Sequence, residues 1–273
     1  MNLKNLLRSS LIVATLPIAG TALADAANDP DYSFIGNIAL TSDYIFRGLT
    51  QTWGGPATQG GGDVAMKNGF AAGFWASSIS DKSYPGASLE LDVHAGYGRA
   101  INDDWSWRVG VYSYLYPNGN LDDVGLPSRS FNTVEANAAL TWKWLTVKYS
   151  SSLTDYFAID TEQGYRGDSK GSGYIQLDAA LPLNAQWSLA LHAGRTNVST
   201  RLAQPLENGA DDPDYDDFGA TLKYQFAQHW SASLGATYAD NHAFYGRTVS
   251  FSNASETRNV GGTRGFAMLQ GTF

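Results

Sequence analysis

The sequence has no cysteine and no long apolar segment. The absence of cysteine excludes disulfides and thiolate metal sites. No stretch after the first 24 residues approaches 18 consecutive apolar residues, so no membrane-spanning helix is predicted. Basic residues are few: the net charge is −8, and it becomes −10 without the two bases of residues 1–24. This acidic balance argues against a nucleic-acid partner.

The first 24 residues have the three parts of a secretory signal peptide. Lys4 and Arg8 precede an apolar run over residues 11–19, and a small-x-small cleavage signal follows at residues 22–24. We therefore predict a signal peptide over 1–24, a short periplasmic segment over 25–32 and one barrel domain over 33–273.

Alternating hydrophobicity is the main structural signal of the chain. In residues 88–98, Leu89, Leu91 and Val93 alternate with polar Glu90 and Asp92. This period of two puts the apolar side chains on one face of a β-strand and the polar ones on the other. A turn signal at residues 102–104 leads into a second alternating strand, so residues 88–116 are predicted to form a hairpin.

The same hairpin unit recurs and predicts twelve strands, an even number as in single-chain outer-membrane barrels. The first is expected over residues 33–47, with Tyr44 and Phe46 on its apolar face, and the last ends at Phe273. Short turns and longer loops alternate between the strands, which places both chain ends on the short-turn, periplasmic side. The predicted fold is all-β: a transmembrane, antiparallel, up-and-down barrel.

Alternation alone does not distinguish a membrane barrel from a soluble, lipocalin-like barrel with an apolar interior. Six of the eight tryptophans cluster beside the short turns, as a periplasmic aromatic girdle would. The polar faces of several strands carry small residues, which predicts a wide interior open to water. Both features favour the membrane barrel. The girdle residues are Trp105, Trp107, Trp142, Trp144, Trp187 and Trp230.

Two segments resemble known outer-membrane proteins. The terminal Phe273, with Leu269 and Ala267 at alternate positions before it, is similar to the C-terminal assembly signal of such proteins. Residues 37–48, followed by Thr-Gln-Thr at 50–52 and by residues 69–70 and 73–77, resemble the start of the TorF-type putative porins of proteobacteria. The resemblance covers about the first third of the chain after residue 24 and implies a pore, without catalytic residues to carry over.

The charged and histidine residues on the polar faces are the candidates for lining the lumen. They could form a charged constriction that favours cations, or they could pair with one another in a wet interior. His94 and His192 are expected to be lone lumen histidines, and no metal or cofactor site is predicted. The candidates are Asp43, Arg47, Asp63, Glu90, Asp92, His94, Arg108, Glu135, Lys148, Asp178, His192, Asp217 and Lys223.

These patterns predict a porin-like channel for passive diffusion of small hydrophilic solutes in the bacterial outer membrane. The expected partners are outer-membrane lipid and lipopolysaccharide, the barrel-assembly machinery, which would recognise the C-terminal strand, and the solutes themselves. One alternative is an outer-membrane lipid-modifying enzyme that uses His94 with Asp92, although no Gly-x-Ser-x-Gly motif is present. The other alternative is a non-conducting barrel that acts as an anchor or adhesin.

Overall fold

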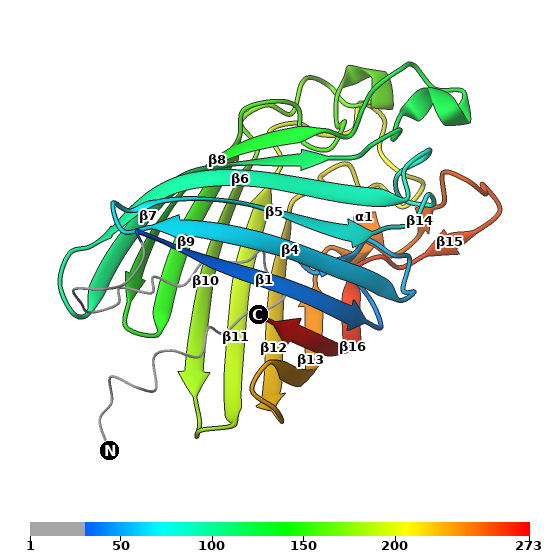
Figure 1. Ribbon diagram of the computed structural model, residues 1–273. Helices are drawn as coiled ribbons and strands as arrows, with labels where there is room; N and C mark the ends of the chain where they lie inside the picture. The colour runs from blue at the N-terminus through cyan, green and yellow to red at the C-terminus, as the bar shows by residue number, and fades with distance from the viewer. Residues whose placement is uncertain (1–30) are drawn as a thin grey trace.

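The computed structural model describes residues 31–273, and in this range twelve long antiparallel strands close into one barrel (Figure 1). Each strand pairs with its neighbours in sequence, and pairing of the first with the last closes the wall. The predicted all-β barrel is confirmed. Its strands are β1 (Tyr32–Thr41), β4 (Ala57–Met66), β5 (Phe70–Ser78), β6 (Leu89–Ala100), β7 (Trp105–Leu115), β8 (Thr133–Trp142), β9 (Leu145–Ser152), β10 (Gly173–Pro182), β11 (Trp187–Asn197), β12 (Tyr215–Gln225), β13 (Trp230–Ala239) and β16 (Gly262–Thr272).

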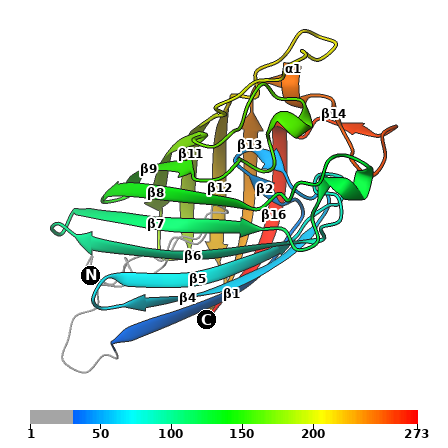
Figure 2. The same ribbon diagram turned by 90° about the horizontal axis from the view of Figure 1, so that it is seen from above.

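Short turns join the strands at one end of the barrel, and the longer loops gather at the other end in both views (Figures 1 and 2). No helix in residues 31–273 is long and apolar enough to span a membrane. The predicted signal peptide lies outside the described residues, as does most of the predicted 25–32 segment. The longer loops carry η2 (Leu121–Val124), η3 (Thr161–Gln163), α1 (His242–Tyr245) and the small pair β14 (Thr248–Val249) and β15 (Thr257–Arg258).

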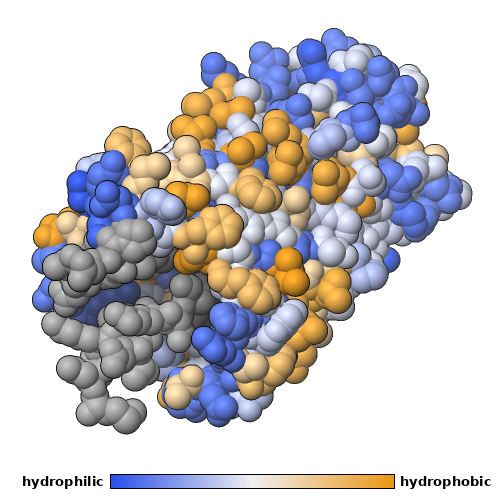
Figure 3. Space-filling model, in the orientation of Figure 1, coloured by the Kyte–Doolittle hydropathy of each residue, from blue (hydrophilic) through white to orange (hydrophobic). Residues whose placement is uncertain are grey.

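The outer surface of the wall is apolar, while polar side chains are buried inside it. Phe34 and Leu234 on the outer face are 63% and 67% exposed, whereas Glu90 and Asp92 on the inner face are 1% and 0% exposed. Hydrophobic residues gather over the strands, and hydrophilic residues gather over the long loops (Figure 3). This arrangement is the inverse of a soluble barrel, and it is the pattern of a barrel that faces lipid. The lipocalin-like alternative is therefore wrong.

The six girdle tryptophans all lie next to short turns. Trp105 contacts Trp142 with ring centroids 6.2 Å apart, and Trp142 lies equally far from Trp144. Trp187 stacks on Tyr224 at 4.6 Å, and Trp230 contacts the terminal Phe273. Indole rings at this level of a barrel suit the lipid headgroup region. Their contact with headgroups stays a prediction.

The first strand is shorter than the alternation predicts. β1 ends at Thr41, and residues 42–56 leave the wall and fold into the barrel. Tyr44, expected to face lipid, is only 5% exposed inside the barrel, and Phe46 also packs among interior aromatic rings. The prediction of a wall strand over 33–47 is therefore wrong. The chain bends away from the wall after Thr41 and reverses inside the barrel at a tight turn, where Arg47 and Gly48 have positive φ angles of 46° and 75°.

Candidate functional site

Residues 42–56, which we call the inward hairpin, occupy the outer half of the lumen. Within it β2 (Ile45–Phe46) pairs with β3 (Leu49–Thr50). The tip reaches the inner face of β12 and β13: a Cβ on Gly48 would lie 2.8 Å from the Cβ atoms of Asp217 and Ala239. Only glycine fits this close approach at a positive φ. The lumen is therefore partly filled at its outer half, in contrast to the open interior expected from the sequence.

Arg47 anchors the tip of the inward hairpin to the far wall. Its Nη1 and Nη2 donate to Oε1 and Oε2 of Glu135 on β8, at 2.9 and 2.7 Å. Nη1 also donates to the hydroxyl of Tyr156, and the guanidinium lies 4.2 Å from the ring centroid of Tyr174. The side chains of Arg47 and Glu135 are 5% and 2% exposed. A bidentate, buried pair of this kind fixes the hairpin in one geometry.

Asp43 holds the base of the inward hairpin. Its carboxylate accepts hydrogen bonds from the hydroxyls of Thr50 and Thr52 and lies 3.3 Å from Nη1 of Arg264 on β16. Arg264 was not among the sequence candidates. The alternation along the strand could have identified it. Ala267 and Leu269 were expected to face lipid, so the even-numbered residues of this strand, Arg264 among them, face the lumen. Asp43 and Arg47, which lie four residues apart, thus pair with two different wall strands.

A second polar cluster lies on the wall beside the hairpin tip. His192 Nδ1 lies 2.6 Å from Asp178 Oδ1, and His192 Nε2 lies 2.9 Å from Asp217 Oδ1. The Tyr174 hydroxyl also lies 2.8 Å from Nε2, so both ring nitrogens have polar partners. The hydroxyl of Tyr174 also donates to Asp217. His192, expected to be alone, is instead paired on both sides.

His94 is paired as well, with a residue two strands away. Its Nε2 lies 2.7 Å from Asp63 Oδ1, and the ring of Tyr112 stacks on it at 4.8 Å. Asp63, Gly73 and His94 lie side by side on β4, β5 and β6. A Cβ on Gly73 would come within 2.4 Å of Asp63 Oδ1 and 2.7 Å of His94 Nε2, so glycine makes room for the pair.

A cavity of about 70 Å³ lies between the inward hairpin and the wall. Hairpin residues form one side of it, and Lys148, Gln176 and His192 are among those on the other. This volume holds a few water molecules and no larger solute. Lys148 is buried, whereas Arg108 and Lys223 are partly exposed nearer the short turns. The inward hairpin therefore narrows the outer half of the lumen.

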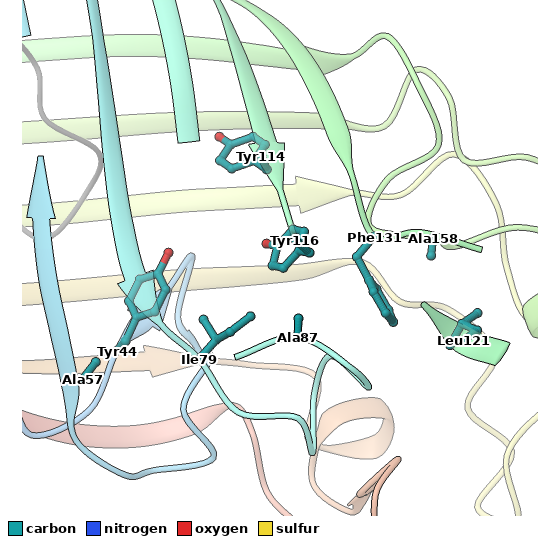
Figure 4. Close-up of a cluster of buried hydrophobic side chains, with 9 residues drawn as sticks. All are labelled: Tyr44, Ala57, Ile79, Ala87, Tyr114, Tyr116, Leu121, Phe131 and Ala158. Atoms are coloured by element: carbon teal, nitrogen blue, oxygen red, sulfur yellow. The ribbon is translucent and has the colours of Figure 1, made fainter. Parts of the chain in front are cut away.

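Aromatic side chains also pack together in the outer half (Figure 4). Tyr44 packs against Trp75 at 5.2 Å, and Phe46 packs against Tyr114 at 5.6 Å. These contacts join the inward hairpin to a buried cluster whose other members come from the wall and the longer loops. The cluster consists of Tyr44, Ala57, Ile79, Ala87, Tyr114, Tyr116, Leu121, Phe131 and Ala158.

Comparison with family models decides the family. The model described as a bacterial protein of unknown function, Gcw_chp, matches residues 25–273. The chain belongs to the Gcw_chp family. No curated protein matches it. The TorF-type resemblance, which is narrower, stays a prediction.

Solved structures share the fold of this Gcw_chp chain at low sequence identity. The KdgM porin in complex with disordered oligogalacturonate is 9% identical, with a TM-score of 0.51, and the match covers 88% of this chain and 99% of that one. A second KdgM porin structure is 10% identical, with a TM-score of 0.50 and coverage of 88% and 99%. The fold is that of an outer-membrane β-barrel.

Proposed function

We propose that this Gcw_chp protein is a narrow, porin-like channel of the outer membrane that passes small hydrophilic solutes and favours cations. The observation that carries the proposal is a closed barrel with an apolar outer face and an inner face lined by polar and charged side chains. Such a wall separates lipid from an aqueous path. The inward hairpin forms the constriction, and the TorF-type resemblance belongs to the same proposal.

The preference for cations rests on the charge of the outer half. Arg47 is neutralised by Glu135 and Arg264 pairs with Asp43, but Glu90 and Asp92 form no ion pair within residues 31–273. Uncompensated carboxylates along a narrow path attract cations. The same carboxylates would repel an acidic oligosaccharide, so the oligogalacturonate of the KdgM complex is not proposed as a solute here.

The surroundings of the barrel follow from its outer face. Outer-membrane lipid and lipopolysaccharide would cover the apolar band, and the barrel-assembly machinery would recognise the C-terminal strand. The terminal Phe273 exchanges two backbone hydrogen bonds with Gly36, at 2.9 and 3.0 Å, so this residue completes the barrel closure. We expect deletion of Phe273 to lower the yield of folded barrel in the membrane.

Single-channel recording in planar bilayers tests the proposal. We expect small discrete conductance steps, with a reversal potential in a KCl gradient that indicates preference for K⁺. Absence of steps would favour the anchor or adhesin alternative, for which the filled outer half is the supporting observation. Anion preference would contradict the assigned selectivity.

The enzyme alternative has less support. His94, its proposed base, lies against Asp63 rather than Asp92. Hydrolysis of phospholipid or lipopolysaccharide in detergent, lost in His94→Ala, would revive it.

A further inference from the structure

Glu90 and Asp92 are successive inward residues of β6, and their buried carboxyl groups have no ion-pair partner among residues 31–273. They are 1% and 0% exposed. Both carboxylate oxygens of Asp92 and Oε2 of Glu90 have no hydrogen-bond partner among residues 31–273. An ionised carboxylate that is buried and unpaired costs several kcal/mol, so each of these groups must either hold a proton or have a cation beside it.

The neighbouring side chains do not supply that compensation. Arg47 of the inward hairpin is already paired, because its guanidinium makes two hydrogen bonds to Glu135. Glu90 Oε1 accepts a hydrogen bond at 3.1 Å from the Tyr116 hydroxyl, and the Tyr44 hydroxyl also contacts this carboxyl group, but Oε2 stays without a partner among residues 31–273. Protonation alone would not satisfy the hydrogen-bonding groups of Asp92, because a protonated carboxyl group has an O–H donor that needs an acceptor of its own.

A fourth unpartnered atom on the same strand, Nδ1 of His94, also points to a ligand. His94, the next inward residue after Asp92, has a side chain that is 9% exposed, and its Nδ1 has no partner within the described residues. Because Nε2 lies against Asp63, we assign the ring proton to Nε2 and a free lone pair to Nδ1. Histidines that bind a metal cation through one ring nitrogen commonly donate a hydrogen bond from the other ring nitrogen to a carboxylate.

The side chains around the two acids also suit a positive charge. In the sheet register Asp92 lies between Trp75 on β5 and Tyr114 on β7. Tyr44 of the inward hairpin covers Trp75. Aromatic faces attract cations and tolerate them better than aliphatic side chains do.

We propose that Glu90 and Asp92 bind one small, hard cation, an alkali or alkaline-earth ion, with His94 at the edge of the site. Oxygen-rich acidic sites prefer such ions. No group of three His, Cys, Asp or Glu side chains within residues 31–273 is close enough to hold a metal ion. The bound ion therefore keeps part of its water shell and exchanges. The site deepens the proposed channel function, because it gives a permeating cation a resting point in the constriction.

Thermal unfolding of the full barrel in detergent tests the site without requiring conduction. NaCl, KCl, MgCl₂ and CaCl₂ are titrated at constant ionic strength against N-methylglucamine chloride. We expect at least one metal ion to raise Tm saturably by about 3 °C or more. Asp92→Asn should abolish the rise, and Glu90→Gln should shift its midpoint at least tenfold. Asp168→Asn removes a charge from an exposed loop position and should behave as wild type.

Terbium luminescence excited through tryptophan supplies a second readout. We expect Tb³⁺ to give a sensitised signal in the wild type that the effective metal competes away, that Trp75→Phe weakens and that Asp92→Asn removes. The site is wrong if Tm shows no saturable metal dependence, or if Asp92→Asn raises Tm equally in every salt, which would mean that the acids hold protons only. A barrel that conducts without metal dependence refutes the site alone, and metal dependence in a barrel that never conducts refutes the channel alone.

Discussion

The outer and periplasmic halves of the lumen share one wall and differ in what fills it. In the outer half, the inward hairpin, buried ion pairs and aromatic rings take up the space. In the periplasmic half, the inner face carries many small side chains, and its charged members include Arg108 and Lys223. These small residues include Ala71, Gly98, Thr141, Thr146, Ala180, Ser188 and Ser231.

This contrast teaches where selectivity resides. Two segments of a pore act in series, so the narrower one limits the flow and the wider one contributes little resistance. The polar face of a strand can line either kind of segment, because the alternation is the same in both. The difference is made by side-chain volume and by a single loop that turns inward.

Removing the inward hairpin should have the largest effect. Thr41 and Ala57 are paired across β1 and β4, so a short glycine–serine turn can replace residues 43–55 without moving the wall. We expect single-channel conductance to rise several-fold, because the constriction is lost. Shortening the exposed loop at residues 204–209 is the matched control and should leave conductance unchanged. Equal conductance in both variants would place the constriction elsewhere.

Breaking the Arg47–Glu135 pair should have the next largest effect. Arg47→Ala leaves a buried carboxylate alone, which costs about 3–5 kcal/mol of stability. We expect a lower unfolding midpoint in urea and noisier channel currents as the hairpin loosens. Adding Glu135→Gln should recover part of the loss, because the unpaired charge is then gone.

The exposed pair of Arg195 with Asp216 is the control for that experiment. Arg195→Ala should cost about 1 kcal/mol or less, because water screens exposed ion pairs. A cost for Arg47→Ala as small as this would contradict the role of Arg47 as an anchor.

Charge removal in the two halves should shift selectivity unequally. Lys148 is buried beside the hairpin cavity, whereas Lys223 lies near the short turns. Lys148→Gln should raise the cation-to-anion permeability ratio about twofold or more, since a charge in a narrow, low-dielectric segment acts strongly on ions. Lys223→Gln should change the ratio less. Reversal potentials in a KCl gradient measure both ratios. A larger change for Lys223→Gln than for Lys148→Gln would mean that selectivity resides in the periplasmic half.

The sequence determines the wall of this barrel far better than its contents. Alternation predicts the twelve strands because every second residue of a strand faces the lumen and the residues between them face lipid, as Glu90 and Asp92 illustrate. It fails at Tyr44 and Phe46, where the same alternation continues after the chain has left the wall. The Arg47–Gly48 turn is the local signal, but arginine rarely marks a positive φ.

The partners of the lumen charges could not be predicted for a related reason. Arg47 and Glu135 are 88 positions apart and meet across the lumen. The alternation places both side chains in the lumen. They meet only because residues 42–56 fold into the barrel. The pairing of His94 with Asp63 likewise depends on Gly73 as the spacer between their strands.

The smallest effect is expected where the outer loops pin the end of the inward hairpin. Glu256 accepts hydrogen bonds from Lys82 Nζ at 2.7 Å and from Trp53 Nε1 at 3.0 Å, so it links two outer loops to the hairpin. The Lys82 ammonium lowers the pKa of Glu256 below its ordinary value. The stabilisation is therefore complete above the ordinary glutamate pKa of about 4.3 and is lost as the pH falls through the lowered value.

Between pH 7 and pH 5, amide hydrogen exchange in residues 248–258, corrected for its intrinsic pH dependence, should thus stay unchanged. Glu256→Gln should speed this exchange a few-fold at pH 7, because it removes the charge while keeping the shape. The exposed acid variant Asp168→Asn should leave the exchange as it is. Faster exchange already at pH 5 would mean that Lys82 does not hold Glu256 in its ionised form, and that the hairpin is fixed by its buried anchor Arg47 alone.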